Sequence, residues 1–162
     1  MPRWVAPLLA LLAVGWIAVL LSAPFLPAPL AAIAYAFGSL ICHQMPERSF
    51  HLQAFQLPVC ARCFGLYGGA AAATVWTGLL QGRAPRVVRR SPRTPHGLRA
   101  ITLAAALPTL VTVGLEWAGV WRPSNVTRAI AGAPLGFAVA YVVMAAMARN
   151  GRDAGRPTLH YD

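Results

Sequence analysis

Long apolar runs separated by short polar stretches dominate the chain. Five runs carry few or no charges, and they cover residues 4–26, 28–42, 63–80, 98–120 and 126–148. A helix of about 20 apolar residues crosses a bilayer, and a somewhat shorter one does so where the bilayer thins. The pattern therefore predicts an all-α membrane helical bundle. It has five transmembrane helices if the short run 28–42 crosses the bilayer, and four if that run is re-entrant.

The composition supports this class of protein. The chain is 57% hydrophobic and 11% charged, whereas about 25% of the residues of a soluble domain are charged. The first apolar run is too long for the apolar region of a signal peptide, and no small-x-small cleavage site follows it, so we expect a retained helix. We expect residues 1–148 to form one transmembrane domain and the polar tail 149–162 to be a disordered cytosolic segment.

The net charge of +10 comes from arginines in the gaps between apolar runs. Because they do not alternate with aromatic residues along a soluble fold, they indicate membrane topology and exclude a nucleic-acid partner. With five spans, the loop 83–99 and the tail after residue 148 hold nine arginines, against five on the other side. This asymmetry predicts that the C-terminus is cytosolic, with the N-terminus outside for five spans and inside for four. We also expect the loop 83–99 to attract anionic lipid.

All three cysteines lie in one polar segment between the second and third apolar runs. Cys60 and Cys63 form a C-x-x-C motif, which can hold one metal ion or one disulfide. Cys42 is a third possible sulfur ligand. Together with either His43 or His51, the three cysteines would supply the four ligands of a tetrahedral zinc site. If Cys42 and Cys60 are on one side, the cluster faces the non-cytosolic side of a prokaryotic cell membrane, an oxidising setting.

The same cysteines permit a second hypothesis, a membrane thiol-disulfide oxidoreductase. Cys60 and Cys63 stand at the start of the third helix with Arg62 between them, and both features lower the pKa of a thiol. Cys42 would then act as the resolving thiol, with electrons passing to a quinone in the lipid. A third possibility is an inert disulfide or simple burial. The sequence does not decide among these, so it leaves open whether the protein is an enzyme.

A second group of polar residues flanks the turn between the fourth and fifth runs. Glu116 and Arg128 lie within one or two helical turns of a span end, where a charge facing lipid costs several kcal/mol. We therefore expect them to face protein or water, and they can pair across the turn. Ser124 or Asn125 fits the N-cap of the fifth helix. The predicted polar pocket consists of Glu47, Arg48, Arg62, Glu116, Asn125 and Arg128. A non-catalytic carrier or assembly factor would use it to hold an anionic lipid head or a partner.

Small residues recur every four positions on two of the predicted helices. The stripes are Gly65, Gly69, Ala73 and Thr77 on the third helix, and Arg128, Gly132 and Gly136 on the fifth. Such stripes allow helices to approach closely in lipid. We therefore expect the third and fifth helices to pack together along them, with the cysteines and Arg128 near one end of the contact.

Three motifs together resemble a known family. They are C-H-Q-x-P-E-R-S-F at 42–50, L-P-V-C-A-R-C-x-G-x-Y at 57–67, and S-N-x-x-R-x-x-x-G-x-x-x-G at 124–136. The combination is similar to the prokaryotic predicted membrane proteins called domain of unknown function 2085, and the likeness covers roughly residues 30–140. The family pattern has Asp before the Ser-Asn turn where this chain has Glu116, which keeps the acid. The resemblance implies a helical membrane protein in which these motifs form one site, and it implies no particular activity.

Overall fold

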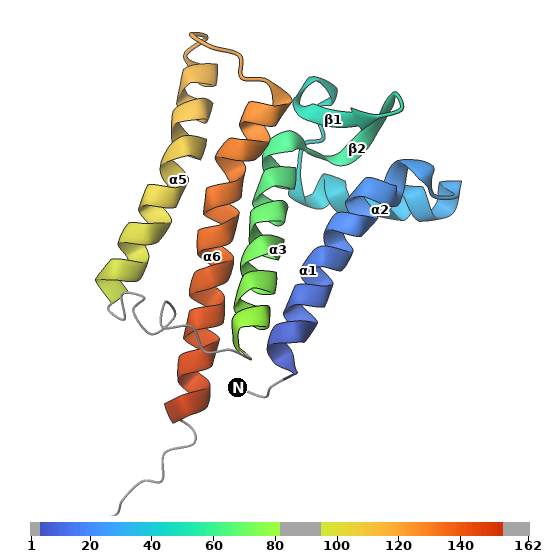
Figure 1. Ribbon diagram of the computed structural model, residues 1–162. Coiled ribbons are helices and arrows are strands. Elements are labelled where there is room, and N and C mark those ends of the chain that lie inside the picture. Colours follow the sequence, from blue (N-terminus) through green and yellow to red (C-terminus); the bar gives the residue numbers. More distant parts are fainter. Residues whose placement is uncertain (1–3, 82–94, 154–162) are drawn as a thin grey trace, which may run out of the picture.

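The computed structural model describes residues 4–81 and 95–153 of the chain (Figure 1). Its elements are α1 (Val5–Ser22), the 3-10 helix η1 (Ala23–Phe25), α2 (Ala28–Ile41), the 3-10 helix η2 (Pro46–Arg48), β1 (Ser49–Leu52), β2 (Phe55–Cys60), α3 (Ala61–Gln81), α5 (Pro95–Trp117) and α6 (Asn125–Asp153). Apart from one small hairpin, the described residues confirm the predicted all-α membrane bundle.

Four long helices lie side by side in the order α5, α6, α3, α1 (Figure 1). Three helical stretches among the described residues are long and apolar enough to cross a membrane, namely Val5–Phe25, His96–Trp117 and Asn125–Met147. Helix α3 has 21 residues and packs between α1 and α6. It thereby completes a four-helix layer of the length that a bilayer requires.

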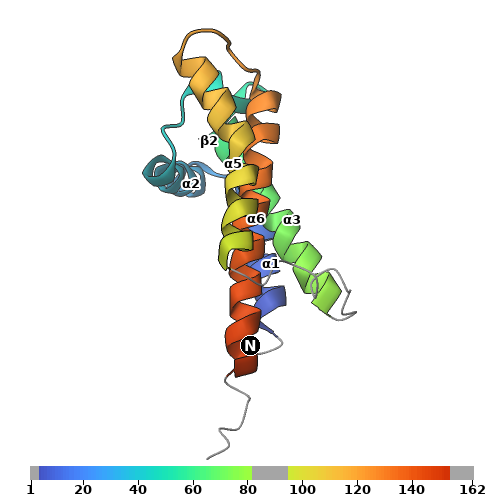
Figure 2. The same cartoon turned by 90° about the vertical axis from the view of Figure 1, so that its left-hand side faces the viewer.

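The second apolar run does not extend alongside the other helices. Helix α2 has 14 residues and lies across one end of the bundle, where Figure 2 shows it projecting to the side. At 1.5 Å per residue it is about 21 Å long, less than the roughly 30 Å of a hydrocarbon core. Of the two alternatives that the sequence leaves open, four long helices or five, the arrangement agrees with four. The start of α1 and the end of α6 consequently lie at the same end of the bundle.

A β-hairpin lies at the other end, next to α2 (Figure 1). Strands β1 and β2 pair antiparallel, with Ser49 opposite Cys60 and Leu52 opposite Phe55. The two turn residues, Gln53 and Ala54, both have positive φ, at 48° and 70°, as a type I′ turn requires. We did not predict this hairpin, because Gln-Ala lacks the Asn-Gly or Asp-Gly signature of that turn and the flanking alternation is short.

Helices α3 and α6 are in close backbone contact. A Cβ atom added at Gly65 would collide with the carbonyl oxygen of Ala129, and one added at Gly136 would collide with that of Leu66. Only glycine permits such an approach, so the predicted contact between the small-residue stripes is confirmed.

Large apolar side chains cover the outside of the bundle. Leu11, Leu103 and Ile130 are each about two-thirds exposed, at 70%, 68% and 67%. A surface this apolar is unstable in water and suits a helical bundle surrounded by lipid.

Two predictions fall largely outside the described residues. Of the arginine-rich loop 83–99, residues 83–94 are not described, so its contact with anionic lipid stays a prediction. Helix α6 continues to Asp153, beyond the apolar run that ends at residue 148. The rest of the tail, 154–162, is again outside the described part of the chain.

Candidate functional site

The three cysteines converge at the hairpin end of the bundle. Cys42 caps the C-terminus of α2, Cys60 ends β2, and Cys63 lies in the first turn of α3. Their sulfur atoms all lie within 4.8 Å of one another, and all three thiols are free. Two thiolates that share one zinc ion at about 2.3 Å lie roughly 3.8 Å apart, so only a small adjustment would let the three sulfurs share an ion.

Backbone contacts and apolar packing hold this sulfur cluster, which we define as Cys42, Cys60 and Cys63. The backbone N–H of Cys60 donates to the Sγ of Cys42 at 3.2 Å. Leu20 and Val59 are fully buried beside Cys42, with Cys60 and Cys63 packed against them. The cluster is therefore closed to bulk water on its core side.

The surroundings of Cys60 lower the pKa of its thiol. The hydrogen bond from the side chain of Cys63 is the main cause, and backbone N–H groups and the Cys42 side chain add to it, so that the pKa of Cys60 falls to about 5 although burial opposes this. A thiolate is the form of cysteine that binds metals and attacks disulfides. The arrangement is thus chemically suited to either use.

The histidines considered as fourth ligands do not join the sulfur cluster. The backbone at Cys42 is extended, with φ −149° and ψ 141°, so the next side chain, that of His43, points away. His43 is exposed, and His51 is exposed on β1 opposite Gln56. Among the described residues, the group that could share an ion contains the three cysteines alone.

Gln44 is a positioning residue that the sequence reasoning missed. Its side-chain amide donates to the carbonyl oxygens of Tyr35 at 2.8 Å and Pro58 at 2.7 Å. Its own carbonyl accepts from Nε2 of Gln56 at 2.6 Å, and its φ is +49°. These bonds join the loop after Cys42 to both α2 and β2. The sequence feature that could have pointed to Gln44 is its place in the first of the three motifs that carry the family resemblance.

A second cluster surrounds the carboxylate of Glu116 at the same end of the bundle. The nearest contacts run from Arg128 Nη2 to Oε1 at 2.8 Å, from Arg48 Nε to Oε1 at 3.2 Å, and from Arg62 Nη2 to Oε2 at 3.4 Å. The side chains of Glu116 and Arg128 are only 7% and 8% exposed. The expected pair of Glu116 and Arg128 is confirmed, and two further guanidinium groups join it.

The turn before α6 contributes in two different ways. Ser124 is the N-cap, because its Oγ accepts from the backbone N–H of Thr127 at 3.2 Å. Asn125 instead makes tertiary bonds. It donates to the carbonyl of Ser49 at 2.8 Å and accepts from Arg128 Nη1 at 2.9 Å.

The structure brings all six residues of the predicted polar pocket together, but Glu47 takes part through its backbone and not through its side chain. Glu47 has an exposed side chain and contributes its backbone carbonyl, which Arg128 Nη1 approaches at 3.5 Å. The others meet through side chains, and Thr112 on α5 adds a hydroxyl 3.4 Å from Arg62 Nη2. We call the ionic core of this group, Arg48, Arg62, Glu116 and Arg128, the arginine cluster.

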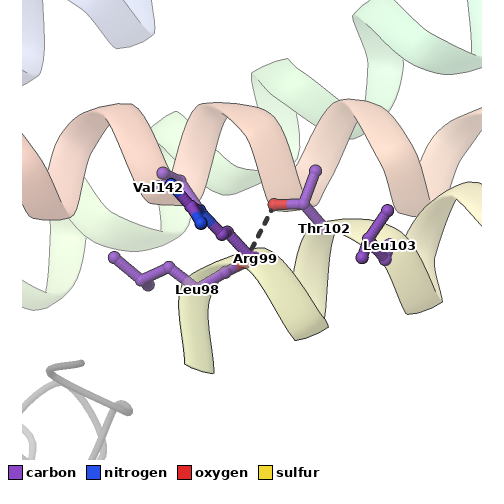
Figure 3. A pocket seen from close by; sticks show the side chains of 5 residues that line it. All are labelled: Leu98, Arg99, Thr102, Leu103 and Val142. Carbon is purple, nitrogen blue, oxygen red and sulfur yellow. Dashed lines mark hydrogen bonds between the residues drawn. The ribbon is translucent and has the colours of Figure 1, made fainter. Parts of the chain in front are cut away.

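A hollow in the described surface lies elsewhere. A shallow cavity of about 370 Å³ between α5 and α6 is lined by Leu98, Arg99, Thr102, Leu103 and Val142 (Figure 3). Thr102 bonds the carbonyl of its own helix at Leu98. The lining is mainly apolar and lacks paired reactive groups, so this cavity carries no chemistry comparable with that of the two clusters.

Comparisons with known proteins agree with this picture. A family model described as "Predicted membrane protein (DUF2085)" matches residues 42–142. An uncharacterized protein of Methanocaldococcus jannaschii is 34% identical over 113 residues, which cover 68% of this chain and 65% of that protein, just under two thirds of its length. An uncharacterized protein of Methanothermobacter thermautotrophicus is 30% identical over 100 residues, 62% of this chain and 81% of that protein. No solved structure matches the chain. The chain therefore belongs to the family of predicted membrane proteins called domain of unknown function 2085.

Proposed function

We propose that the protein binds a thiophilic metal ion, zinc or a related metal, through Cys42, Cys60 and Cys63. The observation that carries this proposal is the convergence of the three sulfur atoms within 4.8 Å, from three separate elements. Soft thiolate ligands favour zinc and Cu(I) over hard cations such as magnesium. The lowered pKa of Cys60 supports the same use, because a metal ligand must be deprotonated.

Three protein ligands leave the fourth position of a tetrahedral ion for another molecule. Structural zinc sites are normally closed by four protein ligands, whereas sites that react or exchange keep one position for water or a substrate. We therefore favour an ion that meets an external ligand over one that merely stabilises the fold. Cys60 and Cys63 are only half-buried, which leaves a side from which such a ligand can approach.

We further propose that the sulfur cluster is on the non-cytosolic face. With four long helices crossing the bilayer, Arg3 moves to the side of the loop 83–99 and the tail. The arginine count then changes from nine against five to ten against four. A larger excess strengthens the assignment of that end to the cytosol. The N-terminus and the C-terminus would then both be cytosolic.

A thiol-disulfide oxidoreductase is the second candidate. The observation in its favour is the presence of Cys42 as a third thiol within 4.8 Å of the C-x-x-C pair. Joining Cys60 and Cys63 in a disulfide would release two electrons and two protons. A quinone in the lipid would take up both and become the quinol, while Cys42 could open mixed disulfides formed during exchange.

The test is the metal content of the purified full-length protein. We expect about one equivalent of zinc or copper per chain, lost in a Cys60→Ser, Cys63→Ser variant and strongly reduced in Cys42→Ser. His43→Ala is the matched control, because His43 is exposed and directed away from the sulfurs, and it should keep the metal.

Absence of metal from protein purified without chelators, and failure to bind added zinc or Cu(I), would overturn the proposal. Thiol counting on the same sample then addresses the second candidate. One free thiol per chain before reduction and three after it would indicate one disulfide, and a Cys42→Ser variant with no free thiol before reduction would assign it to Cys60–Cys63 and favour the oxidoreductase. Three free thiols in the parent even after exposure to a quinone, with no metal, would exclude both.

A further inference from the structure

The arginine cluster carries more positive charge than its own acid can balance. Arg48, Arg62 and Arg128 all contact the single carboxylate of Glu116, which leaves two positive charges in excess. The other acid at this end, Glu47, directs its side chain to solvent and contributes only a carbonyl oxygen. Uncompensated charge in a mostly buried site is unfavourable, because few water molecules can solvate it.

Several donors of the cluster also lack acceptors. The Nε atoms of Arg62 and Arg128 are buried and have no hydrogen-bond partner among the described residues. This is most unfavourable for Arg128, because its side chain is more than nine-tenths buried. Arg48 contacts Glu116 through Nε, and its two terminal nitrogens meet no acceptor among the described residues. A buried guanidinium normally has all of its donors paired, so the buried Nε atoms of Arg62 and Arg128 mark a place where an acceptor is missing. The side chain of Arg48 is 35% exposed, so its terminal nitrogens are open to solvent or to a ligand.

We propose that the arginine cluster is a binding site for a phosphate group at the hairpin end of the bundle. The guanidinium of Arg48, 35% exposed, and that of Arg62, 19% exposed, form the accessible side of the site. Arg128 lies behind them and supplies positive charge from the interior. Asn125 and Glu116 hold Arg128 in place through bonds of 2.9 and 2.8 Å.

The chemistry of the donors suits a phosphate group. Planar guanidinium groups bind phosphate oxygens in pairs, and such charge-assisted bonds are the stronger class of hydrogen bond. A phosphate group carries one or two negative charges and several acceptor oxygens, which match the excess of two charges and the unpaired N–H groups. The group can belong to free phosphate or to the head of a phospholipid, which the end of a membrane bundle would meet directly.

This site does not depend on metal binding by the cysteines. Arg62 lies between Cys60 and Cys63 in the chain, but its guanidinium extends to Glu116 and Thr112 on α5. A protein without any bound metal should therefore still bind phosphate, and the two proposals can fail separately.

The experiment is a titration of delipidated full-length protein in an uncharged detergent, with thermal unfolding as the readout. Sodium phosphate is compared with sodium chloride at equal ionic strength, and micelles with phosphatidylglycerol are compared with micelles of the detergent alone. We expect a saturable rise in the unfolding midpoint with phosphate, with phosphatidylglycerol, or with both. Arg48→Gln should weaken the apparent affinity by at least about tenfold, the effect of losing a charge-assisted bond.

Arg122→Gln is the matched control, because it removes one positive charge at the same end from an exposed residue that has no partner among the described residues. It should leave the affinity unchanged. A response to phosphate identifies the free anion as a ligand, and a response to phosphatidylglycerol alone identifies the lipid head. No saturable response to either, or equal losses in Arg48→Gln and Arg122→Gln, would overturn the proposal. If Arg48→Gln does not fold, the same titration on Arg62→Gln decides.

Discussion

The guanidinium of Arg62 contacts the carboxylate of Glu116, with 3.4 Å between Nη2 and Oε2, although the two residues are 54 positions apart in the chain. Arg62 lies between the two cysteines of the C-x-x-C motif, and Glu116 lies at the C-terminal end of α5, before the turn that leads to α6. The contact therefore links the segment that carries the cysteines to α5. Through Glu116 it also reaches Arg128 on α6, so one carboxylate connects three long elements at this end of the bundle.

Glu116→Gln should destabilise the protein strongly. The neutral amide leaves three guanidinium groups without a negative partner in a site where Glu116 is 7% exposed, and breaking such a buried group costs about 3–5 kcal/mol. Unfolding in detergent would measure the loss. Glu47→Gln is the control, since that side chain is exposed and should change the free energy of unfolding by less than about 0.5 kcal/mol. Similar effects in both variants would mean that Glu116 is not the centre of the ionic group.

Two neighbouring glycines on α3 should respond oppositely to alanine. At Gly69 an added Cβ meets the carbonyl oxygen of Ala133 on α6, whereas at Gly68 it meets nothing within 4 Å. Gly69→Ala should cost about 1–3 kcal/mol or more through overpacking. Gly68→Ala should be neutral or stabilising by up to about 1 kcal/mol, because alanine is the better helix former. Thermal unfolding of both variants compares them directly, and a Gly69→Ala variant as stable as the parent would contradict the α3–α6 contact described.

The two polar residues that begin α6 should differ in importance. Ser124→Ala removes the N-cap bond from the Thr127 N–H and the exposed hydroxyl–hydroxyl bond to Thr127 Oγ1, which together cost about 1 kcal/mol. Asn125→Ala removes the bond to the carbonyl of Ser49 and the bond from Arg128, for a loss of about 2–4 kcal/mol. Measured free energies of unfolding in the reverse order would mean that the bonds of Asn125 to Ser49 and Arg128 contribute less to stability than the cap.

Gln44→Ala should impair metal binding without removing a ligand. The amide of Gln44 bonds the carbonyls of Tyr35 and Pro58 and so fixes the loop that follows Cys42. Loss of such supporting contacts typically lowers metal affinity by about 10–100-fold. A competition titration with a zinc chelator measures the change. Gln53→Ala, at the exposed hairpin turn, is the control and should retain the parent affinity. Equal affinities for the parent and Gln44→Ala would refute this supporting role.

The ends of the chain should be found on the same side of the membrane. The start of α1 and the end of α6 lie at one end of the bundle, because α2 lies across it (Figures 1 and 2). We expect fluorescent reporters that fold only in the cytosol to be active at both termini. A reporter active at one terminus alone would require an odd number of crossings and restore α2 as a span.

The sequence alone determined the class of protein, the approximate positions of the long helices and the two groups of reactive residues. These follow from local properties, since a run of about 20 apolar residues is enough to make a membrane helix and charges within it must face protein or water. Even the α3–α6 contact was predictable, because small residues at four-residue spacing mark one face of each helix.

The tertiary structure decided the features that depend on contacts between distant segments. It placed α2 across the bundle, directed His43 away from the sulfurs and formed the hairpin on Gln53 and Ala54. It also brought three arginines to one acid. Local pattern could not supply these results. The direction of a side chain after an extended cysteine depends on backbone angles, and the groups that surround a charged side chain depend on which helices pack together.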